Sequence, residues 1–198
     1  MNQFVDAQDH SFGSPIQTDV CIVGAGAAGI TLARSLGQSN LDVVLLESGG
    51  LELESQTQAL FQGEVKGIKY YDMAACRLRY FGGTTNHWAG FCRPYTQDAF
   101  AGRPELGVPA WPIDEQALNP YIQRALKDLG LSMEGFSLEY QAKQLGFKME
   151  DLPDRQSTEL VTQVYQLTRH VRQGKYWHDH LARQANLRVL LHANVTRI

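Results

Sequence analysis

A strand, glycine turn, helix and second strand over residues 18–50 constrain this chain more than any other feature. A short apolar run, residues 20–23, leads into the GAGAAG turn of residues 24–29, and an apolar helical stretch follows. A second apolar run, residues 42–46, then ends at an acidic residue. This order of elements predicts a βαβ unit and therefore a Rossmann-like α/β fold.

The glycine turn and the acidic residue have the spacing of a dinucleotide-binding site. Gly24 permits the tight turn, Gly26 lets the backbone approach a pyrophosphate, and Gly29 lets the helix pack against the strand. The helix N-terminus offers N–H groups and a positive dipole end to phosphates. Glu47, 21 residues beyond Gly26, can accept hydrogen bonds from the adenosine ribose. The pattern predicts that FAD or NAD binds here.

Composition and charge exclude several other classes of protein. The 18 basic and 21 acidic residues give a net charge of −3 and are scattered, which predicts neither a nucleic-acid-binding surface nor an anionic-membrane surface. Hydrophobic content of 43% with 20% charged residues is typical of a soluble globular protein. No apolar run reaches the length of a membrane-spanning helix.

The three cysteines indicate a reducing compartment. Cys21, Cys76 and Cys92 match no zinc or redox spacing, and Cys21 is predicted to be a buried residue of the first strand. Residues 1–17 lack the basic start, apolar core and cleavage site of a secretory signal. The sequence predicts a cytoplasmic protein, and a subunit exported together with a partner would have the same pattern.

The chain divides into a flexible polar tail, residues 1–17, and a partial dinucleotide-binding domain, residues 18–198. A long insertion over about residues 51–185 is predicted within that domain. Ile198 stops inside an apolar strand pattern, and two or three parallel strands do not complete a doubly wound sheet. We therefore expect a domain that is incomplete at its C-terminus.

Several further elements follow from caps and periodicity. Two helices are predicted after Trp111-Pro112-Ile113, one with Asp114 as its N-cap and one with Asn119-Pro120 at its start. Residues 158–171 fit a helix or a strand, and residues 175–185 fit a helix. Residues 187–198 predict one strand followed by the start of another.

Residues 77–94, with the sequence RLRYFGGTTNHWAGFCRP, are dense in glycine and aromatic residues and indicate an ordered contact loop. With the glycine turn, the WPI segment and the final HANVTRI, this loop resembles the glucose–methanol–choline (GMC) oxidoreductases. These are FAD enzymes that oxidise alcohols, sugars and polyols. The resemblance runs from about residue 19 to residue 198 and matches the N-terminal part of a longer family, with most similarity to the pyranose oxidase and sugar dehydrogenase branch.

The resemblance implies which residues contact FAD. Gly24, Gly26 and Gly29 would lie against the pyrophosphate and Glu47 on the ribose, and Val195 would meet adenine through its backbone. The residues that would line the flavin are Gly83, Thr84, Asn86, His87, Trp88 and Ala89. His87 stands where a histidine can be joined covalently to the flavin in this branch; a histidine that only hydrogen-bonds the loop or the flavin is the alternative. Ala89 replaces a hydroxyl residue near the reactive edge, which favours a dehydrogenase over an oxidase.

The resemblance places the catalytic base, a histidine paired with His or Asn, near the C-terminus of full-length members, so no catalytic residue is assigned in this chain. His178 and His180 are two residues apart and cannot share one helix face, and no metal site is predicted. The sequence thus predicts the FAD-binding portion of an oxidoreductase that takes a hydride from CH–OH groups. Its partners would be a sugar or alcohol substrate and an electron acceptor. A truncated, non-catalytic remnant and an NAD-binding enzyme are the alternatives.

Overall fold

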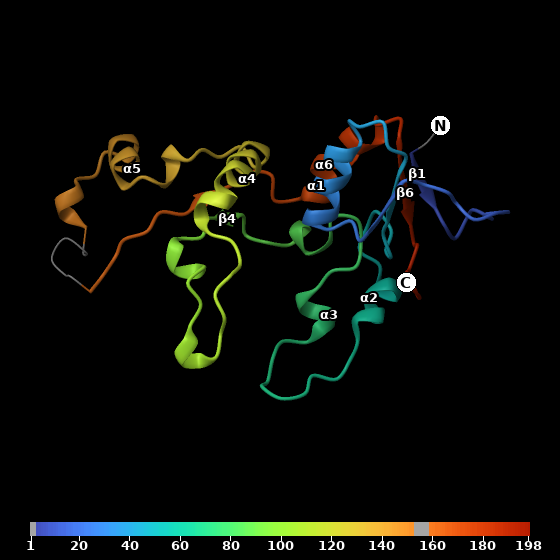
Figure 1. Cartoon of the computed structure of the whole chain (residues 1–198), viewed down its shortest axis with the longest axis horizontal. Helices are drawn as coiled ribbons and strands as arrows, with labels where there is room; N and C mark the ends of the chain where they lie inside the picture. Colours follow the sequence, from blue (N-terminus) through green and yellow to red (C-terminus); the bar gives the residue numbers. More distant parts are fainter. Residues whose placement is uncertain (1–2, 153–158) are drawn as a thin grey trace. The chain divides into compact units, whose positions relative to one another are not determined.

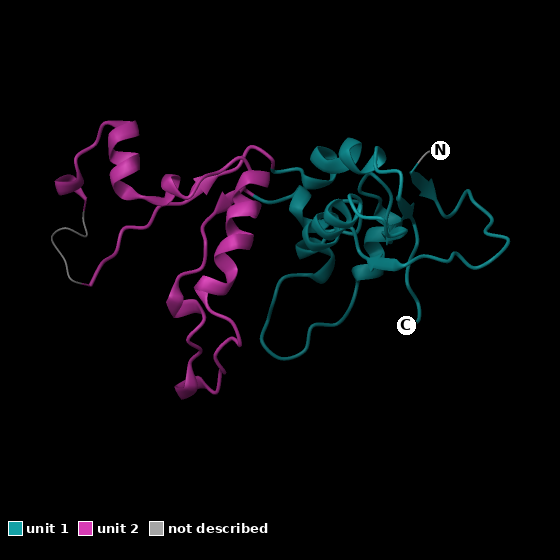
Figure 2. Cartoon of the chain, turned by 45° about the horizontal axis from the view of Figure 1, so that its top comes forward, with its two compact units in different colours: residues 1–88, 171–198 teal, residues 89–170 magenta. Residues whose placement is uncertain are grey.

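The computed structural model describes residues 3–152 and 159–198, which form two compact units (Figure 2). Unit 1 comprises residues 1–88 and 171–198, and unit 2 comprises residues 89–170. The insertion predicted over about residues 51–185 is divided between the two units. Residues 51–88 and 171–185 belong to unit 1 together with the sheet.

A four-stranded sheet forms the centre of unit 1, with the strand order β1-β6-β3-β2 and all neighbours parallel (Figure 1). The strands are β1 (Phe4–Asp6), β2 (Val20–Val23), β3 (Val43–Leu46) and β6 (Leu187–Leu191). In the register of the two central strands, Val43 lies opposite Leu187 and Leu45 lies opposite Val189. The α/β class with a parallel sheet, predicted from the sequence, is confirmed.

Helices α1 (Ala27–Leu36) and α6 (Gln173–Ala182) pack on each other and on one face of this sheet. Alternate residues of each strand face these helices because side chains of a strand point to opposite faces in turn. The buried core comprises Phe4, Ile22, Ala25, Ile30, Ala33, Val43, Leu45, Phe81, Leu181, Leu187, Val189 and Leu191. Burial of such side chains contributes about 1.5–3 kcal/mol each, so this layer fixes the glycine turn firmly.

The N-terminal segment departs from the sequence-based expectation of a flexible tail up to Gln17. Residues Phe4–Asp6 form the edge strand β1, which pairs in parallel with β6. The Phe4 ring is buried and lies edge-on to Phe81, with ring centroids 5.2 Å apart. A single aromatic residue in an otherwise polar segment gives too little periodic signal to predict a strand.

Cys21 is exposed, which corrects the prediction that it is buried in the core. Because Ile22 faces the helices, its neighbours Cys21 and Val23 point to the opposite face of the sheet. The strand β2 is also the edge of the sheet, and Val23 is 58% exposed there. A four-residue apolar run does not reveal which of its faces is covered.

The loops of unit 1 carry short helical pieces. These are α2 (Ser55–Gln58), a 3-10 helix Ala59–Phe61, α3 (Met73–Cys76) and a 3-10 helix Gly83–Asn86. After β6, residues 193–198 are irregular, so the second strand predicted within 187–198 does not form. The predicted helix over residues 175–185 is confirmed as α6, which begins two residues earlier at Gln173.

Unit 2 contains the antiparallel pair β4 (Phe91–Cys92) and β5 (Gln166–Leu167) with two longer helices, α4 (Glu115–Asp128) and α5 (Leu138–Leu145). Asp114 caps α4 as predicted, since its carboxylate accepts from the Ala117 N–H at 2.8 Å. The second helix predicted to start at Asn119-Pro120 is instead a continuation of α4. The helix runs through Pro120 because the φ of proline is compatible with a helix, although its missing N–H removes one internal hydrogen bond. Three further 3-10 helices, Gln97–Ala99, Pro104–Leu106 and Glu134–Phe136, lie in the loops, and Met149–Asp151 forms a fourth.

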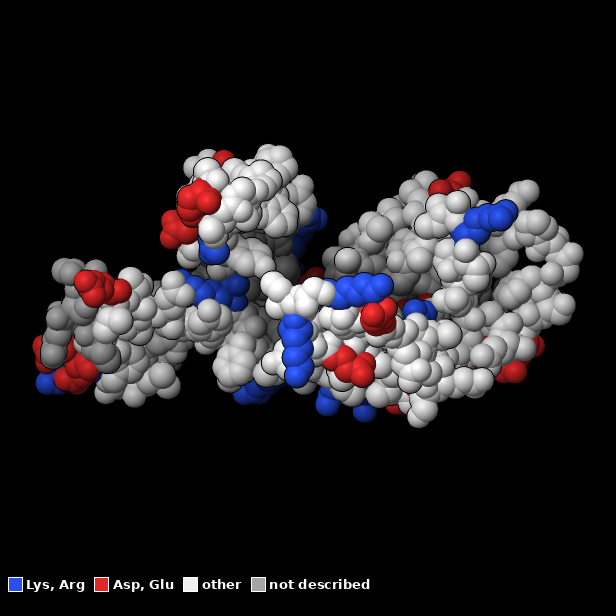
Figure 3. Space-filling view, turned by 90° about the horizontal axis from the view of Figure 1, so that it is seen from below, with Lys and Arg blue, Asp and Glu red and all other residues white. Residues whose placement is uncertain are grey.

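The segment 158–171, for which a helix or a strand was open, contributes only the two residues of β5 to regular structure within the described range 159–171. Residue 158 lies outside the described residues. No helix in residues 3–152 and 159–198 combines the length and hydropathy that crossing a bilayer requires. On the face drawn in Figure 3, basic and acidic side chains are interspersed.

Candidate functional site

The glycine turn between β2 and α1 has the geometry that its sequence predicts. Gly24 has a φ of +93°, and its N–H donates to the Leu46 carbonyl at 2.7 Å. A Cβ on Gly29 would lie 1.9 Å from the Gly24 carbonyl oxygen, so only glycine fits where α1 meets the turn. A Cβ on Gly26 would meet nothing within 4 Å. Space beside the Gly26 backbone is therefore open to a ligand.

The N-terminus of α1 begins in that open space. Gly26 is the N-cap residue and makes no side-chain capping hydrogen bond. An α-helix leaves its first N–H groups without internal partners and concentrates positive dipole there. An anionic group such as a pyrophosphate fits this position electrostatically and sterically.

The Glu47 carboxylate lies beside the turn and is 6% exposed. Its Oε2 accepts from the Ala25 N–H at 2.8 Å, and its Oε1 accepts from the Gly49 N–H at 2.9 Å and the Ser48 hydroxyl at 3.3 Å. A carboxylate has about four acceptor positions, so capacity remains for a hydroxyl donor. Glu47 thus fastens the glycine turn to the end of β3 in addition to its predicted ribose contact.

The second glycine segment, Gly82-Gly83, lies directly against the first. The Gly82 N–H donates to the Ala25 carbonyl at 2.8 Å, and a Cβ on Gly83 would lie 3.5 Å from the Gly26 Cα. Both glycines have positive φ, +96° and +54°, a conformation that other residues rarely adopt. Two segments predicted to contact the same cofactor, about 55 residues apart in sequence, are therefore neighbours in space.

Asn86 uses both ends of its side-chain amide within the protein. It is 4% exposed; its Nδ2 donates to the Phe81 carbonyl at 2.8 Å and its Oδ1 accepts from the Gly174 N–H at 3.0 Å. These bonds close the 3-10 helix and tie it to the start of α6. The structure places this predicted flavin contact where it also holds the shape of the loop.

Three other residues that were predicted to contact the flavin, Thr84, Trp88 and Ala89, have different surroundings. The Thr84 hydroxyl oxygen accepts from the Leu78 N–H at 3.2 Å. The Trp88 indole N–H donates to the Val171 carbonyl at 3.0 Å. Ala89 is exposed and is the first residue of unit 2, so it belongs to a different compact unit from the other predicted residues.

A cavity of about 520 Å³ lies in unit 1 next to His87. It is lined by Leu51, Glu52, Tyr80, Phe81, Asn86, His87, Arg172, Gly174, Lys175 and His178. The exposed His87 ring lies edge-on to Tyr80, with ring centroids 5.9 Å apart. Arg172 and Lys175 add positive charge to this lining. Sequence reasoning missed these two residues, because isolated basic side chains carry no motif.

The segment after β6 returns to the glycine turn on the side of Glu47. The Ala193 N–H donates to the Glu47 carbonyl at 2.8 Å, and Arg79 Nη1 donates to Asn194 Oδ1 at 3.0 Å. Val195 lies two residues after Ala193 and is half-buried. Glu47 and the segment leading to Val195, predicted to contact the ribose and adenine, are thus joined by a hydrogen bond.

The histidines of α6 point to different neighbours, as their spacing predicts. His178 packs on the Phe4 ring with centroids 4.4 Å apart, and its Nδ1 lies 2.9 Å from Asp179 Oδ1. His180 contacts the Trp177 ring instead, with centroids 5.7 Å apart. Among the described residues, no group of three or more His, Cys, Asp or Glu side chains is arranged to hold a metal ion.

Comparison with known proteins finds similarity among solved structures. No family model and no curated protein matches the chain. Among solved structures, the chain is similar to pyridoxine 4-oxidase from Mesorbium loti, with 15% sequence identity and a TM-score of 0.47. The match covers 89% of this chain and 42% of that chain, so the sequence spans less than half the length of that protein.

Proposed function

We propose that this chain is the FAD-binding part of a GMC-type oxidoreductase that oxidises CH–OH groups of sugars, alcohols or polyols. Its small-molecule partners are such a substrate and an electron acceptor, and nucleic acid is not among them. The proposal rests on the sequence resemblance and on the geometry of the glycine turn. Neither a family model nor a curated relative contributes to it.

The observation that carries the proposal is the contact between the two glycine segments. A turn like that of Gly24 to Gly29 suits FAD and NAD equally. The position of Gly83 beside Gly26 favours FAD, because it brings the loop expected at the flavin next to the loop expected at the pyrophosphate. The open space at Gly26 and the helix dipole of α1 supply the place and the charge for the pyrophosphate.

When bound, FAD supplies the redox chemistry, as the acceptor of a hydride from the substrate carbon. The chain's own residues bind and orient it: Glu47 accepts from the ribose, and the 3-10 helix ending at Asn86 shapes the flavin pocket. The positive charge of Arg172 and Lys175 in the cavity favours a ligand with negative charge. Ala89 presents no hydroxyl group, which favours a dehydrogenase over an oxidase.

Substitution of Gly26 by alanine tests the cofactor assignment. The new methyl group meets no protein atom but occupies the space proposed for the pyrophosphate. We expect normal thermal unfolding and an FAD affinity reduced about tenfold or more, measured by quenching of flavin fluorescence. Gly13→Ala, where a Cβ likewise meets nothing within 4 Å, is the matched control.

Three outcomes of the FAD titration and the thermal unfolding measurement would reject the proposal. FAD affinity unchanged by Gly26→Ala would remove the pyrophosphate assignment. Tight binding of NAD with no binding of FAD would identify an NAD-dependent protein. Purified protein that shows no cooperative thermal transition would support the alternative of a non-catalytic remnant.

The covalent link through His87 has its own test. We propose that His87, whose exposed ring lines the cavity, would bond through a ring nitrogen to the flavin 8α-methyl carbon. A methyl C–H bond and the imidazole N–H bond would break, and the electron pair would pass to the flavin and from it to the electron acceptor. Acid precipitation of the FAD-loaded protein should then retain yellow colour in the pellet, and His87→Ala should release it. Release of all colour from the unmodified protein would exclude the bond while leaving FAD binding intact.

A further inference from the structure

His192 ends β6 and turns the chain in an unusual conformation. Its φ is +52°, and among the residues that the structure describes no other residue except glycine has a positive φ. Its N–H donates to the Gly49 carbonyl at 3.1 Å, and the next N–H, of Ala193, donates to the Glu47 carbonyl at 2.8 Å. The turn at His192 therefore sets the path of residues 193–195 past Glu47.

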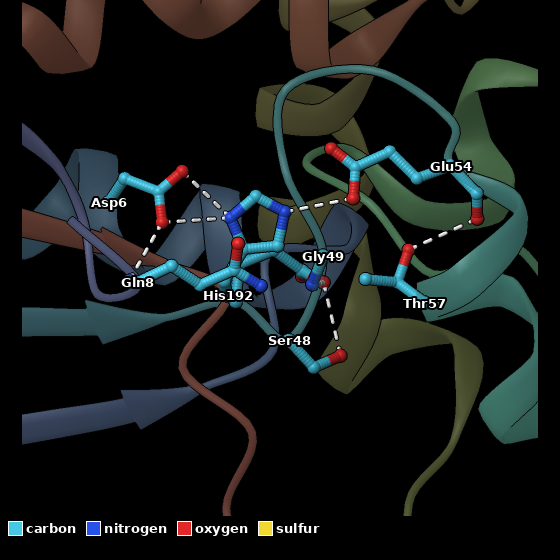
Figure 4. A network of polar contacts seen from close by, with 8 residues as sticks. Asp6, Gln8, Ser48, Gly49, Glu54, Thr57 and His192 are labelled. Atoms are coloured by element: carbon cyan, nitrogen blue, oxygen red, sulfur yellow. Dashed lines mark hydrogen bonds and ion pairs between the residues drawn. The ribbon is translucent and has the colours of Figure 1, made fainter.

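The His192 side chain lies between two carboxylates from separate elements (Figure 4). Nδ1 lies 2.8 Å from Asp6 Oδ2 of the edge strand β1, and Nε2 lies 2.9 Å from Glu54 Oε2, just before α2. The imidazole is 9% exposed. One side chain thus connects the first strand, the last strand and the segment that follows β3.

This arrangement requires a proton on each ring nitrogen. A neutral imidazole has one donor and one acceptor nitrogen, whereas ionised carboxylates only accept. Asp6 and Glu54 can therefore both be bonded only by the imidazolium. Burial lowers the pKa of His192, but the hydrogen bonds from its ring to Glu54 and Asp6 raise it by more, and the net pKa is above its usual value.

Other charged groups near the turn do not replace this pairing. Glu47, at the end of β3, directs its carboxylate to the Ala25 and Gly49 N–H groups. Arg79, from the loop after α3, donates to Asn194. Loss of the His192 proton therefore leaves one of the two carboxylates facing a bare nitrogen lone pair, and that contact is lost.

We propose that His192 is a positioning residue for the adenosine end of the cofactor site, and that it acts in its doubly protonated form. By joining Asp6 to Glu54, the imidazolium fixes the turn that carries residues 193–195 along Glu47. When the ring loses a proton the turn loosens, and the affinity for FAD falls. This inference rests on the proposed function.

The experiment measures FAD affinity from about pH 5.5 to about pH 9, a range that brackets histidine titration. FAD is a suitable probe because its pyrophosphate diester keeps the same charge throughout this range. We compare the unmodified protein with Glu54→Gln, whose amide can accept from the imidazolium or donate to the neutral ring. Glu64→Gln, an exposed carboxylate paired only with Lys66, is the matched control.

In the unmodified protein and in Glu64→Gln, we expect FAD to bind at least about fivefold more weakly at about pH 9 than at about pH 5.5. A fivefold change is the lower end of typical coupling between linked sites. Glu54→Gln should show a flatter profile, because both forms of the ring keep two partners. His87 and His178 are present in all three proteins, so their effect on FAD affinity is common to the three. A second readout, without FAD, is hydrogen exchange of the Ala193 amide: at alkaline pH it should be faster in the unmodified protein than in Glu54→Gln.

The outcomes separate this inference from the function it rests on. Absence of FAD binding at every pH overturns the proposed function and the inference with it. Binding that is independent of pH, or that weakens equally in Glu54→Gln, overturns the role of His192 and leaves the FAD assignment standing.

Discussion

The Oε2 atom of Glu47 accepts a hydrogen bond from the backbone N–H of Ala25 at 2.8 Å. This bond joins the end of β3 to the turn that precedes α1. One side chain thereby holds the turn in shape and presents its remaining acceptor capacity to a ligand. The proposed function thus couples stability and binding at this residue, and its substitution tests both.

Glu47→Gln should weaken both properties. The amide keeps one acceptor oxygen but directs its NH₂ group at a backbone donor, either Ala25 or Gly49. We expect a loss of about 1–3 kcal/mol in the free energy of unfolding from urea titration, and weaker FAD binding at equal folded fraction. Glu64→Gln, on an exposed loop, should change neither. Full stability in Glu47→Gln would show that the two backbone bonds contribute little.

Gly29→Ala should destabilise the fold through a direct clash. Its Cβ would lie 1.9 Å from the Gly24 carbonyl oxygen, which is backbone and cannot rotate away. Overpacking of this kind costs about 1–3 kcal/mol, visible as a lower urea midpoint with unchanged slope. Gly63→Ala, where a Cβ meets nothing within 4 Å, is the control. Equal midpoints for the two variants would contradict the packing of α1 against the turn.

Asn86→Ala should cost more stability than its place in a loop sequence suggests. The substitution leaves the Gly174 N–H and the Phe81 carbonyl without their partner, at about 1–3 kcal/mol for a buried unsatisfied group. Asn86→Asp keeps the acceptor for Gly174 but turns an acceptor oxygen toward the Phe81 carbonyl, so it should cost at least as much as the alanine variant. Asn40→Ala, at an exposed position, serves as control. A loss for Asn86→Ala no larger than that for Asn40→Ala would argue against these two bonds.

Stability should be highest between the titrations of Asp6 and His192. The pKa of Asp6 is lowered below its usual 3.8, first by the Gln8 N–H and also by His192, so its contribution is present above pH 3.8 and is lost as pH falls through the folded-state pKa. The pKa of His192 is raised above its usual 6.5, so its contribution is complete below pH 6.5 and is lost as pH rises through the folded-state pKa. Urea midpoints measured from about pH 3 to about pH 9 cover both limits.

His192→Asn isolates the alkaline part of that profile. Asparagine tolerates the left-handed conformation at this position and does not titrate. The variant should be less stable than the unmodified protein below pH 6.5, and the difference should shrink at higher pH. A constant difference across the range would mean that the His192 ring contributes through packing alone.

The sequence was most informative where one residue type has one structural use. Position 24 needs glycine because its φ is positive, and position 29 needs glycine because a Cβ would clash with the turn. The strands around them are short apolar runs. The glycine turn and these strands were therefore predicted correctly. The contact between Gly26 and Gly83 could not be predicted from spacing, because it depends on how a loop of some fifty residues folds back. The resemblance to a known family identified the two segments, but their contact emerged only from the structure.

The misses share a physical cause, which is that burial is a tertiary property. Cys21 lies in an apolar strand, yet its face of the sheet is exposed at the edge. Phe4 lies in a polar segment, yet it fills a gap beside Phe81. Likewise Asp6, Glu54 and His192 are far apart in sequence, and no local pattern could indicate that they meet.

The hydrogen bond from the Trp88 indole to the Val171 carbonyl has a consequence for how this protein can diversify. The chain leaves unit 1 after Trp88 and returns at Val171, so departure and return are adjacent on the same framework. Insertions, deletions or exchanges within residues 89–170 therefore need not displace the glycine segments. We therefore expect changes of length or sequence within unit 2 to disturb the framework around Gly24 and Gly83 least.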